Sequence, residues 1–402
     1  MPRPLRTALL AAMVVALPAV TLYLISSVVF FDGALLAPLR VIAPTPEVVA
    51  AYLGWLAFQA ALMALLPGKT VQGMPLADGR TLPYRTNGLA ALAVTLLFAV
   101  GAAAAGWLDP AWLFDHVAPL LTAANAIVLV FCLLVAVLSR GQATEEEHRQ
   151  NWVEKYVLGA ALNPRTRSFD WKFFCESRPG MILWVLIDLS ALWAQHARTG
   201  QVSAAMWLVV GCQVFYVVDY FVVEEAILST WDIQHEGFGF ILGWGCLVWI
   251  PFTFSLQAVY LAHHAVDLPA WAVAGVALLN FAGYFIFRTS NLQKNEFRRG
   301  RRTQIWGKPA EFIQTQRGTK LLVSGWWGIA RHANYLGDLM MGLAWCLATG
   351  VDRLVPYFYI TYFTILLVHR EWRDGRHCAE KYGEDWKAYT ARVRWRIVPW
   401  LY

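Results

Sequence analysis

Basic, aromatic and hydrogen-bonding side chains gather in three stretches of the C-terminal part of the chain. These stretches are 288–309, 321–338 and 369–389, and apolar segments lie between them. They are rich in Arg, Lys, His, Asn and Tyr, the side chains that bind anions and donate hydrogen bonds. Their position beside membrane-type segments predicts a site for a large anionic ligand that opens from the cytosol into the bilayer.

The residue types in these stretches fit a phosphorylated dinucleotide better than a bare metal ion. Arg370 and Arg373 offer contacts to phosphate, and Asp374 offers an acceptor for a ribose hydroxyl. Trp326 and Trp327 offer aromatic faces for stacking. The sequence has no GxGxxG turn in a strand–helix context and no P-loop, so side chains would hold the anion. Three histidines are too scattered to predict a metal site: His332, His369 and His377.

A second group of candidate residues lies in the apolar run 204–223 and just beyond it. A carboxylate within a membrane span is costly, so it is expected to face a protein interior and marks a functional hypothesis. Asp219 and Glu225 flank the polar face of this run. The residues at helical spacing on that face are Gln213, Tyr216, Tyr220 and Glu224. For Glu224 and Glu225, the end of a helix is an equally good explanation.

Further acidic groups, Asp232 and Glu236, lie at the mouth of the next apolar run. Gly237 and Gly239 follow and would let another backbone or a ligand come close. Pro251 is expected to break the helix of that run, as in helices that line a cavity. Upstream, three basic residues could simply contact phospholipid: Arg165, Lys172 and Arg178.

The composition is that of a polytopic membrane protein. Of 402 residues, 58% are hydrophobic and 15% are charged, whereas soluble proteins carry about 25% charged residues. Ten apolar runs have about the length that crosses a bilayer. They are 8–31, 47–66, 88–107, 117–138, 180–196, 204–223, 238–261, 269–287, 333–350 and 355–368. We therefore predict an all-α fold of about ten transmembrane helices, with the last two short.

The distribution of charge orients these helices. With the N-terminus in the cytoplasm, the outer loops hold only Arg40, Arg198 and Arg353 of the 33 Lys and Arg residues. This agrees with the positive-inside bias and places both termini in the cytoplasm. The first apolar run is too long for a signal peptide and is expected to be retained. The six Cys residues show no paired spacing, so neither a disulfide framework nor a zinc site is expected.

Several sequence blocks resemble a known family of membrane enzymes. LLVHREWRDGRHCAEKYG (366–383) closely resembles the second signature of the ERG4/ERG24 sterol reductases, and GAALNPR (159–165) resembles the end of their first. Blocks such as STWDIQHEGFGFILGWG and LLVSGWWGIARHANYLGD follow in the same order, so that the resemblance covers about residues 150–402. It departs from the family pattern at Glu154-Lys155-Tyr156, which weakens any catalytic role there.

The resemblance implies a ten-span enzyme that uses NADPH to reduce a sterol double bond. We expect a four-span scaffold at 1–140 and a six-span catalytic core at 141–402, with an NADPH pocket in 286–402 and a sterol pocket in 204–261. Carried over by motif, the residues that would hold NADPH are Lys294, Arg298, Leu322, Trp327, Asn334, Tyr335, Arg370, Asp374, Cys378, Lys381, Tyr382 and Tyr389.

The expected reaction requires an acid as well as a hydride donor. An isolated sterol alkene is not polarised, so protonation to a tertiary carbocation would precede hydride transfer. The acid candidates are Tyr216, Asp219, Asp232 and Glu236. Sequence resemblance favours the delta-14 bond, with the delta-7 bond as the alternative. A second alternative rests on RHANY and the C-terminal KYGEDWKAY, which resemble isoprenylcysteine carboxyl methyltransferases that use S-adenosylmethionine.

The expected partners are a sterol that enters from the bilayer, and membrane lipids. No nucleic-acid partner and no obligate protein partner are expected. Ala-rich spans and short termini are typical of bacteria, which predicts the inner membrane. In a eukaryote the same protein would lie in the endoplasmic reticulum.

Overall fold

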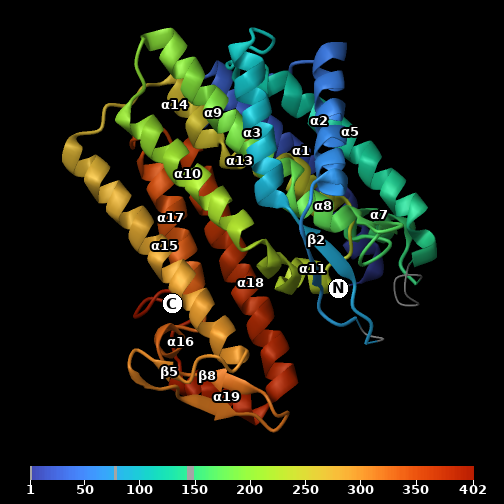
Figure 1. Ribbon diagram of the computed structural model, residues 1–402, viewed down its shortest axis with the longest axis vertical. Helices are drawn as coiled ribbons and strands as arrows, with labels where there is room; N and C mark the ends of the chain where they lie inside the picture. The colour runs from blue at the N-terminus through green and yellow to red at the C-terminus, as the bar shows by residue number, and fades with distance from the viewer. Residues whose placement is uncertain (1, 77–78, 143–148) are drawn as a thin grey trace. The chain divides into compact units, whose positions relative to one another are not determined.

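The protein is described from a computed structural model that covers residues 2–76, 79–142 and 149–402. It is mostly helical, with four short two-stranded antiparallel sheets in the described residues (Figure 1). The chain divides into two compact units, Met1–Val266 and Asp267–Tyr402. This boundary differs from the one expected after residue 140, because the first four spans pack with the next three in one unit.

Six unbroken apolar helices of 17 residues or more lie in the described part of the first unit. They are α1 (Arg3–Phe30), α2 (Pro46–Leu65), α3 (Gly88–Ala104), α5 (Val117–Leu138), α9 (Pro179–Thr199) and α10 (Ala204–Val222). Local sequence sets their ends. The Thr45 side chain accepts from Val48 N at the start of α2, and the Ser203 side chain accepts from Met206 N at the start of α10. Gly200, with φ of 75°, ends α9.

Short elements connect these helices. The helices are α4 (Trp112–Asp115), α7 (Trp152–Leu158), α8 (Trp171–Ser177) and α11 (Trp231–His235), with 3₁₀ turns at Arg140–Gln142 (η1) and Glu224–Ser229 (η2). The strands are β1 (Lys69–Gln72), β2 (Pro83–Thr86), β3 (Arg165–Thr166) and β4 (Phe169–Asp170). Asn151 and Glu154 form a capping box on α7, and Glu154 also lies 3.6 Å from both Arg3 and Arg6. The residue that departs from the family pattern therefore has a structural role.

The last apolar stretch of the first unit is broken, as Pro251 predicted. It runs through α12 (Phe240–Trp244), a π-helical turn η3 (Gly245–Trp249), α13 (Ile250–Phe254) and α14 (Leu256–His263). The π-helical turn ends just before the proline, which has no backbone N–H to donate. Ser255 and Gln257 are buried inside the protein, so the break places polar groups in the interior.

The second unit is built on three long helices. These are α15 (Ala270–Arg298), α17 (Ala333–Leu347) and α18 (Phe358–Tyr382), which lie side by side in Figure 1. The remaining helices are α16 (Trp326–Ile329), η4 (Val355–Tyr357) and α19 (Glu384–Arg392). Two hairpins follow α15, formed by β5 (Gln304–Ile305), β6 (Lys308–Pro309), β7 (Phe312–Gln314) and β8 (Lys320–Leu322).

The predicted spans are largely confirmed as helices. Seven helical segments of the described chain are long and apolar enough to cross a membrane, and Gly88–Ala104 is a shorter apolar helix. The protein is therefore an integral membrane protein. The last two predicted spans correspond to α17, which has 15 residues, and to the first part of α18. The count of ten spans and the cytoplasmic placement of both termini stay predictions.

Candidate functional site

The second unit brings most of the predicted cofactor-binding residues into one neighbourhood. Cys378 on α18 lies within electrostatic range of Asp374, Lys294, Lys381 and Arg298. Burial and the Asp374 charge together raise the pKa of the Cys378 thiol to about 11, while the three cations oppose this rise. Lys294 and Arg298 belong to α15, and Asp374 and Lys381 belong to α18, so the two helices place their charged groups around the same thiol.

Packing contacts hold three of the predicted residues in place: Lys294, Trp327 and Tyr389. The Lys294 ammonium lies 3.8 Å from the centroid of the Trp327 ring, and Trp327 Nε1 donates to the Ser290 carbonyl at 2.9 Å. Trp327 is buried with Ile305 and Leu322, and the Lys294 ammonium covers one face of its indole. On α19, Tyr389 is buried against Val323 and Val393.

His332 also lies in this neighbourhood, although the sequence predicted neither a metal-binding role nor any other role for it. Its ring stacks on Tyr335 with centroids 4.7 Å apart, and its Nε2 lies 3.7 Å from Asp374 Oδ2. Burial and the nearby cations Lys294, Arg331 and Arg370 lower the pKa of His332 to about 3. The imidazole is therefore neutral at physiological pH. In the sequence, the position of His332 inside the RHANY block was the signal that could have identified it as a site residue.

The C-terminal tail positions the block that contains His332. Arg331 N donates to the Trp395 carbonyl at 2.9 Å, and His332 N donates to the Arg396 carbonyl at 2.8 Å. Asn334 follows in the first turn of α17. Its Oδ1 is buried, without a hydrogen-bond donor in the described part of the chain. An unsatisfied acceptor among several cations fits a ligand that carries both hydrogen-bond donors and negative charge. The remaining predicted residues, Leu322 and Tyr382, end β8 and α18.

In the first unit, Gln213, Tyr216 and Tyr220 lie on α10 and are buried or half-buried, whereas Glu224 lies beyond the helix in η2. Gln213 is fully buried, where it accepts from Trp184 Nε1 at 3.2 Å and donates to the Phe254 carbonyl at 3.0 Å. The Tyr216 ring lies 6.1 Å from the Trp184 ring, centroid to centroid. Tyr220 donates to the Glu176 carbonyl at 3.0 Å. Asp219, on the same helix, is half-buried.

The other two acid candidates lie at α11. Trp231 Nε1 donates to Glu236 Oε1 at 3.0 Å, and the Lys172 ammonium donates to the Glu236 carbonyl at 2.6 Å. Asp232 is half-buried in the first turn of α11. Lys172 also donates to the Ile233 carbonyl at 3.0 Å, so it fastens α11 to α8.

The structure corrects one interpretation of the sequence and adds one residue that the sequence interpretation left out. Lys172 and Arg178 are fully buried and bind groups inside the protein, so they are not phospholipid contacts. Asp188 was overlooked, although a carboxylate in an apolar run is itself a signal. It is fully buried in α9, beside the Trp184 side chain.

The glycines at the mouth of the seventh span behave as predicted. A Cβ on Gly239 would lie 2.3 Å from Gly159 N, and a Cβ on Gly237 would lie 2.6 Å from the Leu158 carbonyl oxygen. Phe238 N donates to the Ala161 carbonyl at 3.1 Å. The close approach is therefore between two backbones, and it joins the GAALNPR block to the HEGFGF block.

Comparison with known proteins accounts for these blocks. The profile of the ergosterol biosynthesis ERG4/ERG24 family matches residues 10–402. The chain belongs to the ERG4/ERG24 family. It is 48% identical over 400 residues to a Delta(14)-sterol reductase of Methylotuvimicrobium alcaliphilum, with 97% of this chain and 94% of that protein covered.

Other members of the ERG4/ERG24 family are almost as similar. The Delta(14)-sterol reductase TM7SF2 of Mus musculus is 44% identical over 353 residues, covering 87% of this chain and 84% of its own length. A 7-dehydrocholesterol reductase of Xenopus laevis is 41% identical over 385 residues, covering 90% and 81%. Family membership extends to the N-terminal spans, which the sequence blocks did not reach. It also argues against the methyltransferase alternative, which left the LNPR and HEGFGF blocks without a place.

Proposed function

We propose that the protein is an NADPH-dependent sterol reductase that acts on the delta-14 double bond of the sterol ring system. The observation that carries this proposal is the 48% identity to a Delta(14)-sterol reductase across 97% of the chain. The delta-7 bond is the second candidate, because a 7-dehydrocholesterol reductase matches over 90% of the chain. The sterol would come from the bilayer, and a bacterial host would hold the protein in its inner membrane.

The side chains of the second unit fit NADPH. Lys294, Arg298, Arg370 and Lys381 provide cations for its phosphates. Asp374 provides an acceptor for a ribose hydroxyl, and the unsatisfied Asn334 Oδ1 accepts a further hydrogen bond. We infer that side chains replace the glycine-rich turn of the usual dinucleotide folds. Once bound, NADPH supplies the hydride that the reduction requires.

The neutral His332 has a positioning role in this proposal. Its ring packs on Tyr335 and its Nε2 lies near the Asp374 carboxylate, so it helps to orient two residues of the binding set. A protonated His332 would be repelled by the nearby cations Lys294, Arg331 and Arg370. A neutral ring orients these side chains without that repulsion.

The first unit would supply the proton. A half-buried Tyr or carboxyl group can hold and donate a proton to the sterol alkene, and a tertiary carbocation then develops on the ring. Tyr216, Asp219, Asp232 and Glu236 are the proposed donors. The Trp184 indole beside Tyr216 is the kind of aromatic face that stabilises a cation. The apolar body of the first unit excludes water from a developing carbocation.

Complementation tests the function and the position of the bond together. The gene is expressed in one yeast strain that lacks delta-14 reduction and in another that lacks delta-7 reduction, and the sterols are extracted. We expect the delta-14 sterol to be reduced in the first strain and the delta-7 sterol to persist in the second. Reduction in the second strain alone would replace our assignment by the delta-7 bond. Reduction in neither strain, with the protein present in the membrane, would contradict the proposal.

A further inference from the structure

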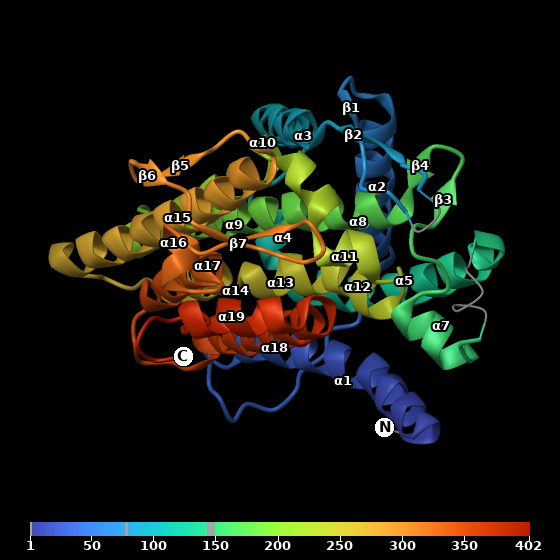
Figure 2. The same ribbon diagram turned by 90° about the horizontal axis from the view of Figure 1, so that it is seen from below.

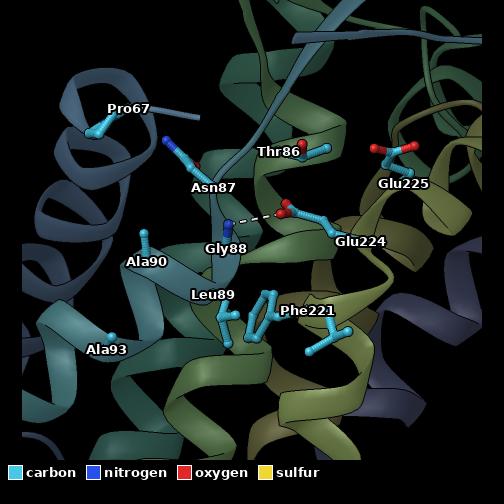
Figure 3. Close-up of a pocket in the computed structure, with 11 residues that line it drawn as sticks. Pro67, Thr86, Asn87, Gly88, Leu89, Ala90, Ala93, Phe221, Glu224 and Glu225 are labelled. Atoms are coloured by element: carbon cyan, nitrogen blue, oxygen red, sulfur yellow. Dashed lines mark hydrogen bonds between the residues drawn. The ribbon is translucent and has the colours of Figure 1, made fainter. Parts of the chain in front are cut away.

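An open surface cavity of about 510 Å³ lies between the start of α3 and the end of α10, in the first unit. Figure 3 shows it from close by, with Gly88 and Leu89 on α3 facing Phe221 and Glu224. Pockets for small ligands have volumes of about 300–1,000 Å³. The cavity shares none of the residues that we assign to NADPH or to proton donation.

One wall of the cavity is acidic and rigid. Glu224 Oε2 accepts from Gly88 N at 2.8 Å, and the other oxygen of this carboxylate accepts from the buried Arg178 guanidinium. Arg178 also donates to Asn87 Oδ1 at 2.8 Å, so Arg178 and the start of α3 together hold the carboxylate in place. Each carboxylate oxygen can accept a second hydrogen bond. This wall therefore offers acceptors to a ligand with a hydrogen-bond donor.

The lining contains no Lys, Arg or His among the described residues. At the rim, Glu225 is 2.5 Å from Lys69 Nζ, so the Lys69 cation is already paired. A phosphate group entering the cavity would face two carboxylates that are already paired with Arg178 and Lys69, and it would find no unpaired cation in the described lining. Anionic ligands and phospholipid headgroups are therefore disfavoured, and an uncharged donor such as a hydroxyl is favoured.

The other wall is apolar and continues onto the surface of the spanning helices. Ala90 and Ala93 on α3 and Phe221 on α10 line it, and α3 and α10 run next to each other in Figure 2. At the edge, Leu89 is 44% exposed and Val222 is 58% exposed. Exposed apolar side chains on spanning helices face lipid, so the cavity is accessible from the bilayer.

A small residue at position 88 keeps the cavity in this form. A Cβ on Gly88 would lie 2.3 Å from Phe221 Cδ1 and 2.7 Å from Arg178 Nη1. Any other residue would separate α3 from α10 at the level of the Glu224 carboxylate. The acidic and apolar walls therefore adjoin only because this position is glycine.

We propose that this cavity is a docking site for the hydroxyl end of a sterol that arrives from the bilayer. The sterol hydroxyl donates to the Glu224 or Glu225 carboxylate, and the adjoining ring packs on Ala90, Ala93 and Phe221. The choice of a sterol rests on the proposed function, because a sterol is the uncharged, flat, hydroxyl-bearing lipid that the reaction would consume. The site itself rests on the cavity and its charge.

Photolabelling in nanodiscs tests the site directly. The probe is a hydroxysterol with a diazirine on its ring system, incorporated at low concentration in phosphatidylcholine, and labelled peptides are mapped. We expect labelling in the segments around 88–93 and 221–225. Ala93→Trp fills the cavity and should reduce this labelling at least tenfold. Val100→Trp adds the same indole to an exposed position of α3, about 10 Å further along the helix, and should leave labelling unchanged.

Competition identifies the group that the cavity recognises. Excess unlabelled hydroxysterol should displace the probe, whereas its 3-keto analogue, which cannot donate, should compete about tenfold less well. Equal competition by the two sterols, displacement by phosphatidylethanolamine, or equal labelling of both Trp variants would overturn the proposal.

The outcome is separable from that of the proposed function. Labelling at these segments in a protein that reduces no sterol would support the docking site and contradict the enzyme assignment. Sterol reduction without labelling at these segments would support the enzyme assignment and contradict the docking site. In an active enzyme, we further expect Ala93→Trp to raise KM for the sterol at least fivefold without changing the Kd for NADPH.

Discussion

Arg178 and Glu224 form an ion pair whose side chains are 0% and 4% exposed. Arg178 precedes α9 and Glu224 begins η2, so the pair joins two segments that are far apart in the sequence. Glu224 also accepts from Gly88 N, which adds the start of α3 to the same junction. The acidic wall of the cavity between α3 and α10 depends on this junction.

Breaking this pair should destabilise the protein. Glu224→Gln leaves the Arg178 charge buried without a counter-charge, and we expect the free energy of unfolding to fall by about 3–5 kcal/mol. Asp188→Asn is the matched control, because its buried carboxyl forms no ion pair within the described chain and Asn has nearly the same shape. We expect its effect to be below about 1 kcal/mol. Thermal unfolding in detergent measures both, and equal effects would contradict this account.

Removing single groups from the second unit should weaken NADPH binding without unfolding the protein. We expect Asp374→Ala and Arg370→Ala each to raise the Kd for NADPH by about ten- to a hundredfold, because each removes a charge-assisted hydrogen bond. Arg299→Ala, an exposed cation outside the proposed binding set, should leave the Kd unchanged. Titration calorimetry measures all three variants. An unchanged NADPH affinity in either of the first two would contradict our placement of the cofactor.

Cys378 offers a readout of the same site that does not depend on activity. It is the one partly exposed cysteine of the six, all of which the structure describes. Because the pKa of its thiol is raised to about 11, the reactive thiolate is scarce at pH 7. Labelling by N-ethylmaleimide should be slow at pH 7, accelerate up to about pH 11, and be suppressed by NADPH but not by S-adenosylmethionine. Mass spectrometry of the labelled peptide measures the rate of this reaction. A fast reaction at pH 7 would contradict the environment described for the Cys378 thiol.

Acid should destabilise the second unit through His332. Its pKa is about 3 in the folded protein against an ordinary value of 6.5, so between these values the unfolded chain binds more protons. Stability therefore rises with pH through this window and is lost as pH falls below about 6.5. The slope from this one group is at most about 1.4 kcal/mol per pH unit. His332→Asn should flatten the dependence of unfolding on pH between 4 and 6; an unchanged slope would show that other groups cause it.

Substitutions on α10 should separate proton donation from cofactor binding. If Tyr216 donates the proton, Tyr216→Phe should lower kcat by about 10²–10⁴ and leave the Kd for NADPH unchanged. Tyr220→Phe is the control one helical turn away, because its hydroxyl already donates to the Glu176 carbonyl. We expect it to retain most of its activity. Full activity of Tyr216→Phe would move the role to Asp219, Asp232 or Glu236, where the corresponding amide variants provide the same test.

The sequence by itself determined the class of protein and its family. Apolar runs of bilayer length predicted the spanning helices, because backbone groups in lipid must be satisfied within helices. The helical spacing of Gln213 and Tyr220 predicted polar side chains on the interior face of α10, and Pro251 predicted the break in the seventh span. The blocks around 159–165 and 366–383 predicted the family.

Only the tertiary structure decided which polar groups belong together. The sequence left Lys172 and Arg178 as ordinary membrane-proximal cations, because burial and partners depend on contacts between distant segments. It gave no role to Asp188, and for His332 it only argued against a metal site, because the cations near His332 come from separate segments, among them α15 and α18. The cavity between α3 and α10 was invisible for the same reason: its acidic wall is assembled from Gly88 and Glu224, 136 positions apart.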